Sequence, residues 1–321
     1  MPLLFIQDLE VDFRLNGRWV RAVDGVSLAI QAGETVCIVG ESGCGKSVTA
    51  LSVARLLPEP PARIAGGRIE LEGRNVFELS SRDLRTVRGG VVSYVFQEPG
   101  AALNPVFRVG AQILETLRIH RPQRATHAEV LRLLAEVGLA DPERRARNYP
   151  HELSGGMQQR VMIAMAIATE PKLLIADEPT TALDVTIQAQ ILDLLKDLKR
   201  RLGMAILLIT HNLGLVGDIA DRIVVMYAGQ VIESGPAAAL LRSPVHPYTR
   251  ALIQSVPEIG QSRDRLRAIP GSVPQLGQWP TGCRFAPRCP LVQATCHLQA
   301  PPLTSAGTDP AHQVRCPIAT A

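Results

Sequence analysis

One eight-residue segment limits what this chain can fold into more than any other. It reads Gly40-Glu41-Ser42-Gly43-Cys44-Gly45-Lys46-Ser47 and matches the pattern G-x-x-x-x-G-K-[ST] at every position. The apolar run Thr35–Val39 precedes it, and a helical pattern from Lys46 to Leu56 follows. In that context glycines let backbone N–H groups surround phosphates, and the helix N-terminus adds the positive end of its dipole. The segment therefore predicts a phosphate-binding loop.

The side chains of this loop suggest how a nucleotide would be held. Lys46 places a cation on the β- and γ-phosphates, and the Ser47 hydroxyl can ligate Mg²⁺. Cys44 is interpreted as a small packing residue rather than a reactive thiol. The residues predicted to contact the nucleotide are Gly40, Ser42, Gly43, Cys44, Gly45, Lys46, Ser47 and Val48.

A second pattern places two carboxylates at the end of a buried strand. The apolar run Leu173–Ala176 is followed directly by Asp177 and Glu178. Ligands of an open α/β sheet bind beyond the carboxyl ends of its strands. Asp177 can hold Mg²⁺ through water, and Glu178 can act as the general base for an attacking water. The alternative is an ordinary acidic strand end, which the phosphate-binding loop makes less favoured.

The first 255 residues read as an α/β fold. Short runs rich in Ile, Leu and Val, such as Thr35–Val39 and Ala205–Ile209, are typical of buried parallel strands. Between them lie helical patterns such as Ile187–Leu202. This alternation predicts a parallel sheet covered by helices.

A third segment narrows the class of protein further. It reads Leu153-Ser154-Gly155-Gly156-Met157-Gln158-Gln159-Arg160. It resembles the signature of the ATP-binding subunits of ABC transporters, which begins LSGGQ; Met157 departs from the commonest Gln. The resemblance implies that Ser154, Gly155 and Gly156 contact the γ-phosphate of ATP on an opposite subunit, so that two chains enclose two ATP molecules. A plain Ser N-cap before a helix is the other interpretation, and both can hold.

The other motifs of that family follow in order. Gln97 resembles the Q-loop glutamine, which reaches Mg²⁺ and the attacking water, and Thr181-Ala182-Leu183-Asp184 resembles the D-loop, which crosses the dimer interface. His211 resembles the switch histidine, which contacts the γ-phosphate. The resemblance thus implies Glu178, His211 and Gln97 as catalytic residues, and Ser47, Gln97 and Asp177 as Mg²⁺ ligands. Phe13 and Trp19 are both candidates for stacking on adenine.

The resemblance also implies an architecture. We expect a P-loop NTPase core of the RecA-like type within residues 1–255, an antiparallel β subdomain near the N-terminus, and an α-helical subdomain at about 98–165. The helical subdomain would receive coupling helices from two transmembrane permease subunits. Only 55 residues separate Gln97 from Leu153, which leaves no room for the long coiled coil of the DNA-repair relatives.

Four segments resemble the peptide-importer branch of the family: Val91–Val106, Tyr149–Glu152, Met226–Gly229 and Ser243–Thr249. They imply an ATPase subunit of a dipeptide or oligopeptide importer, with a nickel importer as the alternative. A second, related ATPase is the implied partner, which favours a heterodimer over a homodimer. An extracytoplasmic substrate-binding protein would act indirectly.

The composition changes after about residue 255. Residues 256–321 hold 10 of the 24 prolines, no lysine and four of the six cysteines, which predicts an irregular C-terminal extension. Cys283, Cys289, Cys296 and Cys316 lack the C-x₂₋₄-C pair usual for zinc. Four thiolates can hold a 4Fe–4S cluster, which the resemblance favours, while zinc and unliganded thiols stay open. Three arginines lie near these cysteines in the sequence: Arg284, Arg288 and Arg315. They either offset the negative charge of the cluster or are solvated surface residues.

Charge and hydropathy argue against other classes of protein. A net charge of +4, with no concentrated basic run, does not favour nucleic acid as a partner. No apolar run approaches the ~18 residues of a membrane span, and Met1–Glu10 lacks a signal-peptide pattern. We expect a peripheral protein on the cytoplasmic face of the cell's inner membrane. Two rivals remain: a non-transport ABC ATPase acting on DNA or ribosomes, and an iron–sulfur sensor that binds ATP without hydrolysing it.

Overall fold

The structure, a computed structural model, describes residues 1–181, 183–255, 269–307 and 309–318. Ala182 of the expected D-loop and residues 256–268 of the expected extension lie outside the described residues. The chain forms two compact units. The first consists of Met1–Ile30, Thr35–Phe77 and Ile209–Ala321, and the second of Gln31–Glu34 and Glu78–Leu208. Among the described residues, no helix combines the length and apolarity needed to cross a membrane.

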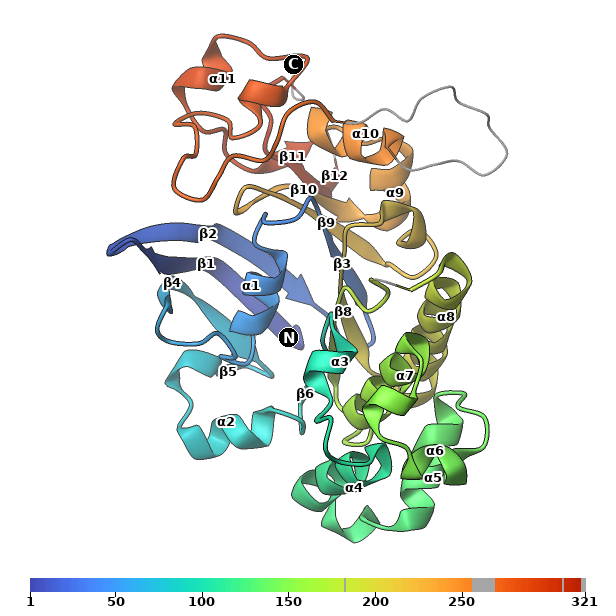
Figure 1. The fold of residues 1–321 in the computed structure, drawn as a ribbon. Helices are drawn as coiled ribbons and strands as arrows, with labels where there is room; N and C mark the ends of the chain where they lie inside the picture. The colour runs from blue at the N-terminus through green and yellow to red at the C-terminus, as the bar shows by residue number, and fades with distance from the viewer. Residues whose placement is uncertain (182, 256–268, 308, 319–321) are drawn as a thin grey trace. The chain divides into compact units, whose positions relative to one another are not determined.

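The first unit contains an antiparallel sheet with the strand order β2-β1-β4-β5 (Figure 1). Its strands are β1 (Leu4–Leu15), β2 (Arg18–Ile30), β4 (Ala62–Leu71) and β5 (Arg74–Asn75). Asn16 and Gly17 join β1 to β2 with φ angles of 47° and 79°, the conformation that an Asn-Gly hairpin turn requires. This sheet agrees with the antiparallel β subdomain expected near the N-terminus.

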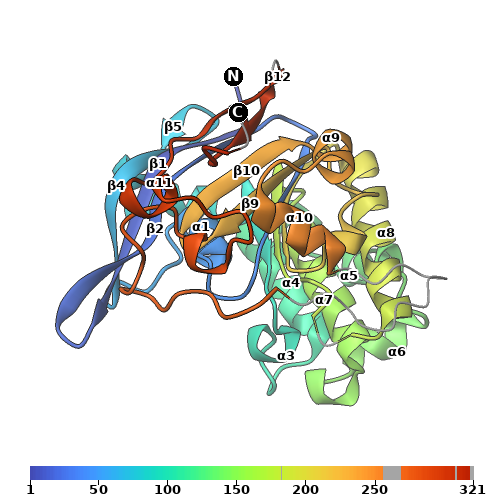
Figure 2. The same ribbon diagram turned by 90° about the horizontal axis from the view of Figure 1, so that it is seen from above.

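The first unit also contains strands in the order β11-β12-β10-β9-β3. They are β3 (Thr35–Val39), β9 (Arg222–Tyr227), β10 (Gln230–Pro236), β11 (Thr304–Ala306) and β12 (Asp309–Val314). Its helices are α1 (Lys46–Ser52), α9 (Ala237–Arg242), α10 (Pro247–Gln254) and α11 (Thr295–Leu298). Figure 2 shows β9 and β10 side by side, and β3 pairs with β9 in parallel. The extension therefore adds two strands to β10, which its composition did not predict.

The second unit holds strands in the order β8-β7-β6, with β6 (Val92–Val95) parallel to β7 (Leu173–Asp177). The last two residues of β8 (Ala205–Thr210) fall in the first unit. The helices are α2 (Ser81–Val87), α3 (Pro99–Ala102), α4 (Val109–His120), α5 (His127–Glu136), α6 (Pro142–Arg147), α7 (Gly155–Ile167) and α8 (Val185–Leu202). Strands and helices alternate, which confirms the predicted α/β class.

Candidate functional site

The phosphate-binding loop lies between β3 and α1 and depends on three glycines. Gly40, Gly43 and Gly45 have φ angles of 153°, 81° and 100°, a region that side chains disfavour. A Cβ on Gly40 would also lie 2.2 Å from the carbonyl oxygen of Met226. The loop conformation therefore needs glycine both for its dihedral angles and for its close approach to β9.

Lys46 is buried within the loop. Its Nζ donates hydrogen bonds to the carbonyl oxygens of Gly40, at 2.9 Å, and Glu41, at 3.0 Å. Glycine-rich backbone and a nearby ammonium are what a phosphate group needs, so these residues fit the predicted ligand. Ser47 and Val48 are half-buried at the start of α1, and Ser42 is exposed.

Cys44 has the packing role predicted for it. The residue is fully buried, and burial raises the pKa of its thiol. Its carbonyl oxygen accepts a hydrogen bond from the Gly229 N–H at 3.0 Å. A buried, protonated thiol is a poor nucleophile, so Cys44 contributes volume and backbone rather than reactivity.

In the second unit, three predicted motif residues meet at the end of β7. Glu178 accepts hydrogen bonds from Gln97 Nε2 at 3.1 Å and from Thr181 Oγ1 at 2.8 Å. The φ angle of Glu178 is 46°, which a non-glycine residue adopts only at a cost and which is frequent at functional sites. Asp177 immediately precedes it. The structure thus brings the predicted base and the Q-loop glutamine together.

The predicted Mg²⁺ ligands have suitable donor chemistry. Ser47, Gln97 and Asp177 offer a hydroxyl, an amide and a carboxylate oxygen. Magnesium prefers oxygen ligands and is commonly held by one or two carboxylates together with the phosphates of its substrate. Each residue therefore offers a donor atom of the kind that Mg²⁺ binds, Ser47 in the first unit and Gln97 and Asp177 in the second.

The signature segment opens α7. Ser154 has the extended backbone of an N-cap, and Ser154 and Gly155 are exposed, while Gly156 is half-buried. The Gln158 side chain donates to the carbonyl oxygens of Pro150, at 2.9 Å, and Leu153, at 3.2 Å. These bonds hold the segment that leads into the helix. The Ser154 side chain itself accepts no capping hydrogen bond, so only its backbone matches the N-cap interpretation.

The remaining motif residues are placed as follows. Asp184 caps α8 by accepting the Ile187 N–H at 2.9 Å. His211 follows β8 in the first unit and is exposed.

The two candidates for stacking on adenine differ in their surroundings. The guanidinium of Arg63 lies 4.1 Å from the ring centre of Trp19, whereas Phe13 is half-buried on β1. Arg63 stacks on one face of Trp19, so only the opposite face of that ring is available for adenine.

The four cysteines of the extension are free thiols, two of them buried: Cys283, Cys289, Cys296 and Cys316. Burial raises the pKa of Cys283 and of Cys289, and charge on Cys296 and Cys316 raises both further. Across the described part of the chain, however, no three His, Cys, Asp or Glu side chains are arranged to hold a metal ion. The predicted 4Fe–4S site is therefore not confirmed. The extension also contains His312, whose Nε2 lies 2.8 Å from Oε1 of the buried Glu233.

The extension arginines were expected to offset cluster charge or to be solvated at the surface, and two of them are not solvated. The Arg288 side chain is only 4% exposed and pairs with Glu41, and that of Arg284 is 11% exposed and pairs with Asp24. Sequence reasoning missed both pairs because their partners lie more than 200 residues away. Arg315 interacts electrostatically with Asp24 and with Cys283.

Comparisons with known proteins agree with these motifs. The ABC transporter family matches residues 23–181, and the family described as "Oligopeptide/dipeptide transporter, C-terminal region" matches residues 232–296. A Sinorhizobium fredii protein named as a peptide ABC transporter ATP-binding protein is 51% identical over 98% of this chain and 94% of its own length. A Brucella abortus protein named as a peptide import ATP-binding protein is 48% identical, over 98% and 95%.

Solved structures give the same result. An ATP-binding cassette, solved as a post-hydrolysis dimer bound to ADP and Pi, superposes with a TM-score of 0.65 at 27% identity. It covers 73% of this chain and 98% of its own. Part of an ABC transporter complex from Clostridium perfringens has the same score and identity, covering 75% and 91%.

Proposed function

The chain belongs to the ABC transporter family of ATP-binding proteins, and from this membership we propose that it hydrolyses ATP to drive peptide import through a membrane-embedded permease. The observation that carries the catalytic part is the convergence of Gln97 and Thr181 on Glu178. The peptide cargo is supported by the matched C-terminal region and by the names of the relatives. The nickel alternative and a role on DNA or ribosomes have no such support.

The proposed reaction converts ATP and water to ADP and phosphate. Lys46 binds the β- and γ-phosphates, and Ser47, Asp177 and Gln97 are the residues that would hold Mg²⁺. The bound ion would neutralise phosphate charge. Glu178 accepts the proton of the attacking water while Gln97 orients that water, and His211 contacts the γ-phosphate. Phe13 is the proposed support for the adenine ring.

The proposed assembly contains two ATPase subunits and two permease subunits. Ser154, Gly155 and Gly156 would act on ATP held by the partner ATPase, consistent with the exposure of Ser154 and Gly155. We propose a related second ATPase as that partner, with a homodimer as the alternative. The helical segment at about 98–165 would receive the permeases at the cytoplasmic face of the inner membrane, and an extracytoplasmic binding protein would deliver the peptide.

The four-cysteine centre is a separate proposal. We propose that Cys283, Cys289, Cys296 and Cys316 bind a 4Fe–4S cluster, supported by their four free thiols and by the hydrogen bond from the Cys283 N–H to the Cys296 carbonyl oxygen at 2.8 Å, which brings two of them together. The described thiol positions do not themselves form a metal site, so the side chains would have to turn toward a common centre. Anaerobic purification should yield about four irons per wild-type chain and fewer in Cys289→Ser. Zinc, or no metal, contradicts the cluster.

Substitution of the proposed base tests the ATPase directly. Glu178→Gln keeps the shape of the side chain but removes the proton acceptor, so we expect ATP turnover to fall at least about 100-fold, as is usual for loss of a general base. ATP binding should persist because Lys46 is intact. Turnover and peptide uptake are measured in the assembled transporter reconstituted in vesicles. Near wild-type turnover in the variant would refute the assigned base.

The matched control is Glu59→Gln, an exposed carboxylate between α1 and β4 and outside the segment proposed to receive the permeases. It changes the same chemistry away from the motif residues, and its turnover should equal that of the wild type. Uptake of nickel instead of peptide by the intact transporter would contradict the cargo, and co-purification of nucleic acid in place of permease subunits would contradict the transport role.

A further inference from the structure

Two arginines of the C-terminal extension reach the phosphate-binding loop and the turn beside it. Arg288 Nη1 donates to Glu41 Oε2 at 2.8 Å, and Arg288 Nη2 donates to Glu41 Oε1 at 3.0 Å. Such a bidentate ion pair fixes the orientation of the two side chains as well as pairing their charges. Glu41 is the second residue of the loop, so the extension contacts the predicted nucleotide site within the first unit itself.

Every polar group of Glu41 forms a hydrogen bond. Its N–H donates to the Tyr248 hydroxyl at 2.9 Å, and its carbonyl oxygen accepts from Lys46 Nζ at 3.0 Å. Its carboxylate pairs with Arg288. The position of Glu41 is therefore linked directly to that of the phosphate-binding lysine.

Arg288 is itself held firmly. Its Nε donates to the Pro270 carbonyl oxygen at 2.8 Å, and Nη1 donates to the Tyr227 hydroxyl at 3.3 Å. The neighbouring Phe285 is fully buried against Tyr227 and Tyr248, with ring centres 5.3 Å from each. A guanidinium fixed this way can position a partner, because its own side chain has little freedom left to lose.

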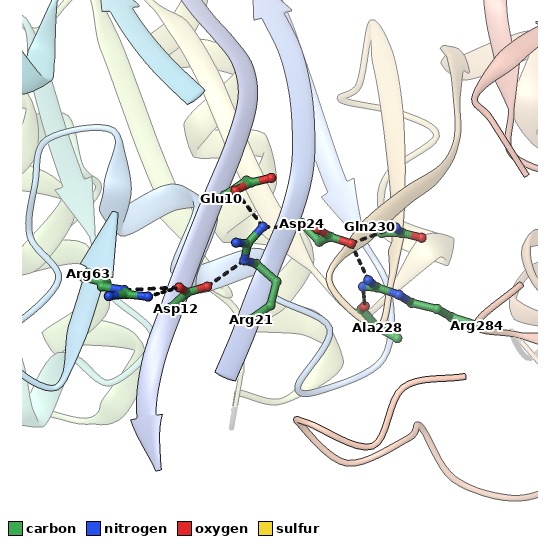
Figure 3. A network of polar contacts seen from close by, with 8 residues as sticks. All are labelled: Glu10, Asp12, Arg21, Asp24, Arg63, Ala228, Gln230 and Arg284. Atoms are coloured by element: carbon green, nitrogen blue, oxygen red, sulfur yellow. Dashed lines mark hydrogen bonds and ion pairs between the residues drawn. The ribbon is translucent and has the colours of Figure 1, made fainter. Parts of the chain in front are cut away.

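Arg284 provides a second connection (Figure 3). Its guanidinium stacks 3.7 Å from the ring centre of Trp279 and donates to Asp24 and to the Ala228 carbonyl oxygen. The next residue, Gly229, donates its N–H to the carbonyl oxygen of Cys44 in the loop. Arg284 thus holds the β9–β10 turn, which contacts the phosphate-binding loop through the Gly229–Cys44 hydrogen bond.

We propose that Arg288 is a positioning residue for nucleotide binding that acts through Glu41, and that Arg284 supports the same loop through the β9–β10 turn. The inference rests on the proposed ATPase function. Without Arg288, Glu41 presents an unpaired carboxylate within a loop that must accept negatively charged phosphates. The extension thereby sets the affinity of the loop for nucleotide.

The test uses the full chain and the non-hydrolysable analogue AMP-PNP with Mg²⁺, and it measures Kd by titration calorimetry. Arg288→Gln should raise Kd about tenfold, equivalent to about 1.4 kcal/mol. Glu41→Gln should change Kd less than about twofold, because the amide oxygen can still accept a hydrogen bond from Arg288 while the negative charge that needs a cationic partner is removed. The double variant should return to the Kd of Glu41→Gln, and Arg288→Lys should lie between the wild type and Arg288→Gln.

Arg315→Gln is the matched control. Arg315 belongs to the same extension, but its hydrogen bonds go to the carbonyl oxygens of Val231, at 2.9 Å, and Pro301, at 3.0 Å. We expect this variant to melt at a lower temperature with an unchanged Kd. Equal weakening by Arg315→Gln and Arg288→Gln would overturn the proposal, since it would show a general loosening of the extension.

Two further outcomes would also overturn it: a wild-type Kd for Arg288→Gln, or a double variant as weak as Arg288→Gln. If Arg288→Gln does not fold, the double variant and Arg288→Lys decide the question, since neither leaves Glu41 charged and without a cationic partner. A wild-type chain that binds no nucleotide refutes the proposed function instead. A chain that binds nucleotide regardless of Arg288 refutes only the positioning role.

Discussion

Asp12 is a buried carboxylate on β1 that two arginines share. Arg21 Nε lies 2.6 Å from its Oδ1 and Arg63 Nη2 lies 2.9 Å from its Oδ2 (Figure 3). Burial by itself would raise the pKa of Asp12, but the hydrogen bonds and charges of the two arginines lower it overall. The arginines come from β2 and β4, so one carboxylate ties three strands of the antiparallel sheet together.

Asp12→Asn should therefore destabilise the chain in a pH-dependent way. Near neutral pH we expect the free energy of unfolding to fall by about 2 kcal/mol, the scale of a hydrogen bond to a charged group. A lowered folded-state pKa means that the stabilisation is complete above the unfolded pKa of about 3.9 and is lost as the pH falls through the folded value. Urea unfolding of both proteins over that pH range measures the difference.

Asp197→Asn serves as the comparison for this experiment. Asp197 on α8 is 46% exposed and pairs with Arg200 and Arg201 of the same helix. Exposed pairs of this kind contribute little, so we expect a change below about 0.5 kcal/mol. If the difference between wild type and Asp12→Asn stays constant into acid pH, the stabilisation does not come from the Asp12 carboxylate.

At the scale of elements, local patterns predicted a strand that is buried on both faces and a helix that is buried along one face. Thr35–Val39 is β3 as expected, and Ile187–Leu202 lies within α8, because apolar periodicity is a local property of the sequence. The β11–β12 hairpin was not predicted. Its β12 strand reads Asp309-Pro310-Ala311-His312-Gln313-Val314, with too few apolar residues to show alternation. It forms by pairing with β10, about 80 residues earlier in the chain.

The extension was expected to be irregular, but it contributes to a core shared with other elements. Phe285 packs against Tyr227 of β9 and Tyr248 of α10, whose ring centres are 4.7 Å apart. These three side chains are among the largest fully buried ones in the described residues. Because the contacts join segments distant in sequence, composition alone could not indicate them.

Phe285→Ala tests how much of the extension depends on this packing. Truncating a buried phenylalanine costs about 3–5 kcal/mol, so we expect the extension to open and its amide hydrogens to exchange faster. Hydrogen exchange read by mass spectrometry locates the change. Leu298→Ala, at a side chain 78% exposed, should leave exchange unchanged. Faster exchange in Cys289→Ser but not in Phe285→Ala would show that the cysteines, not the aromatic core, hold the extension.

At the scale of the whole molecule, the order of the motifs predicted the family, although the motifs lie far apart in the sequence. Phosphate loop, Q-loop, signature, carboxylate pair and switch histidine occur at residues 40, 97, 154, 177 and 211. The contact of Gln97 with Glu178 agrees with the roles predicted for both. The Arg288–Glu41 pair has no motif of its own, because an ion pair across 247 residues leaves no spacing signal.

The signature should act on a nucleotide bound by another subunit, and Ser154→Arg tests that arrangement. Ser154 is exposed at the start of α7, so a larger, charged side chain there should fold normally but obstruct the partner's γ-phosphate. We expect hydrolysis in the assembled transporter to fall at least about tenfold, a loss of about 1.4 kcal/mol in transition-state stabilisation. The Kd of the isolated chain for AMP-PNP should stay within about twofold of wild type, since its own loop is unchanged. Lys46→Ala is the comparison: it should weaken nucleotide binding by the isolated chain itself. If Ser154→Arg weakens binding by the isolated chain as strongly as Lys46→Ala does, the signature serves the chain's own nucleotide and the shared arrangement is wrong.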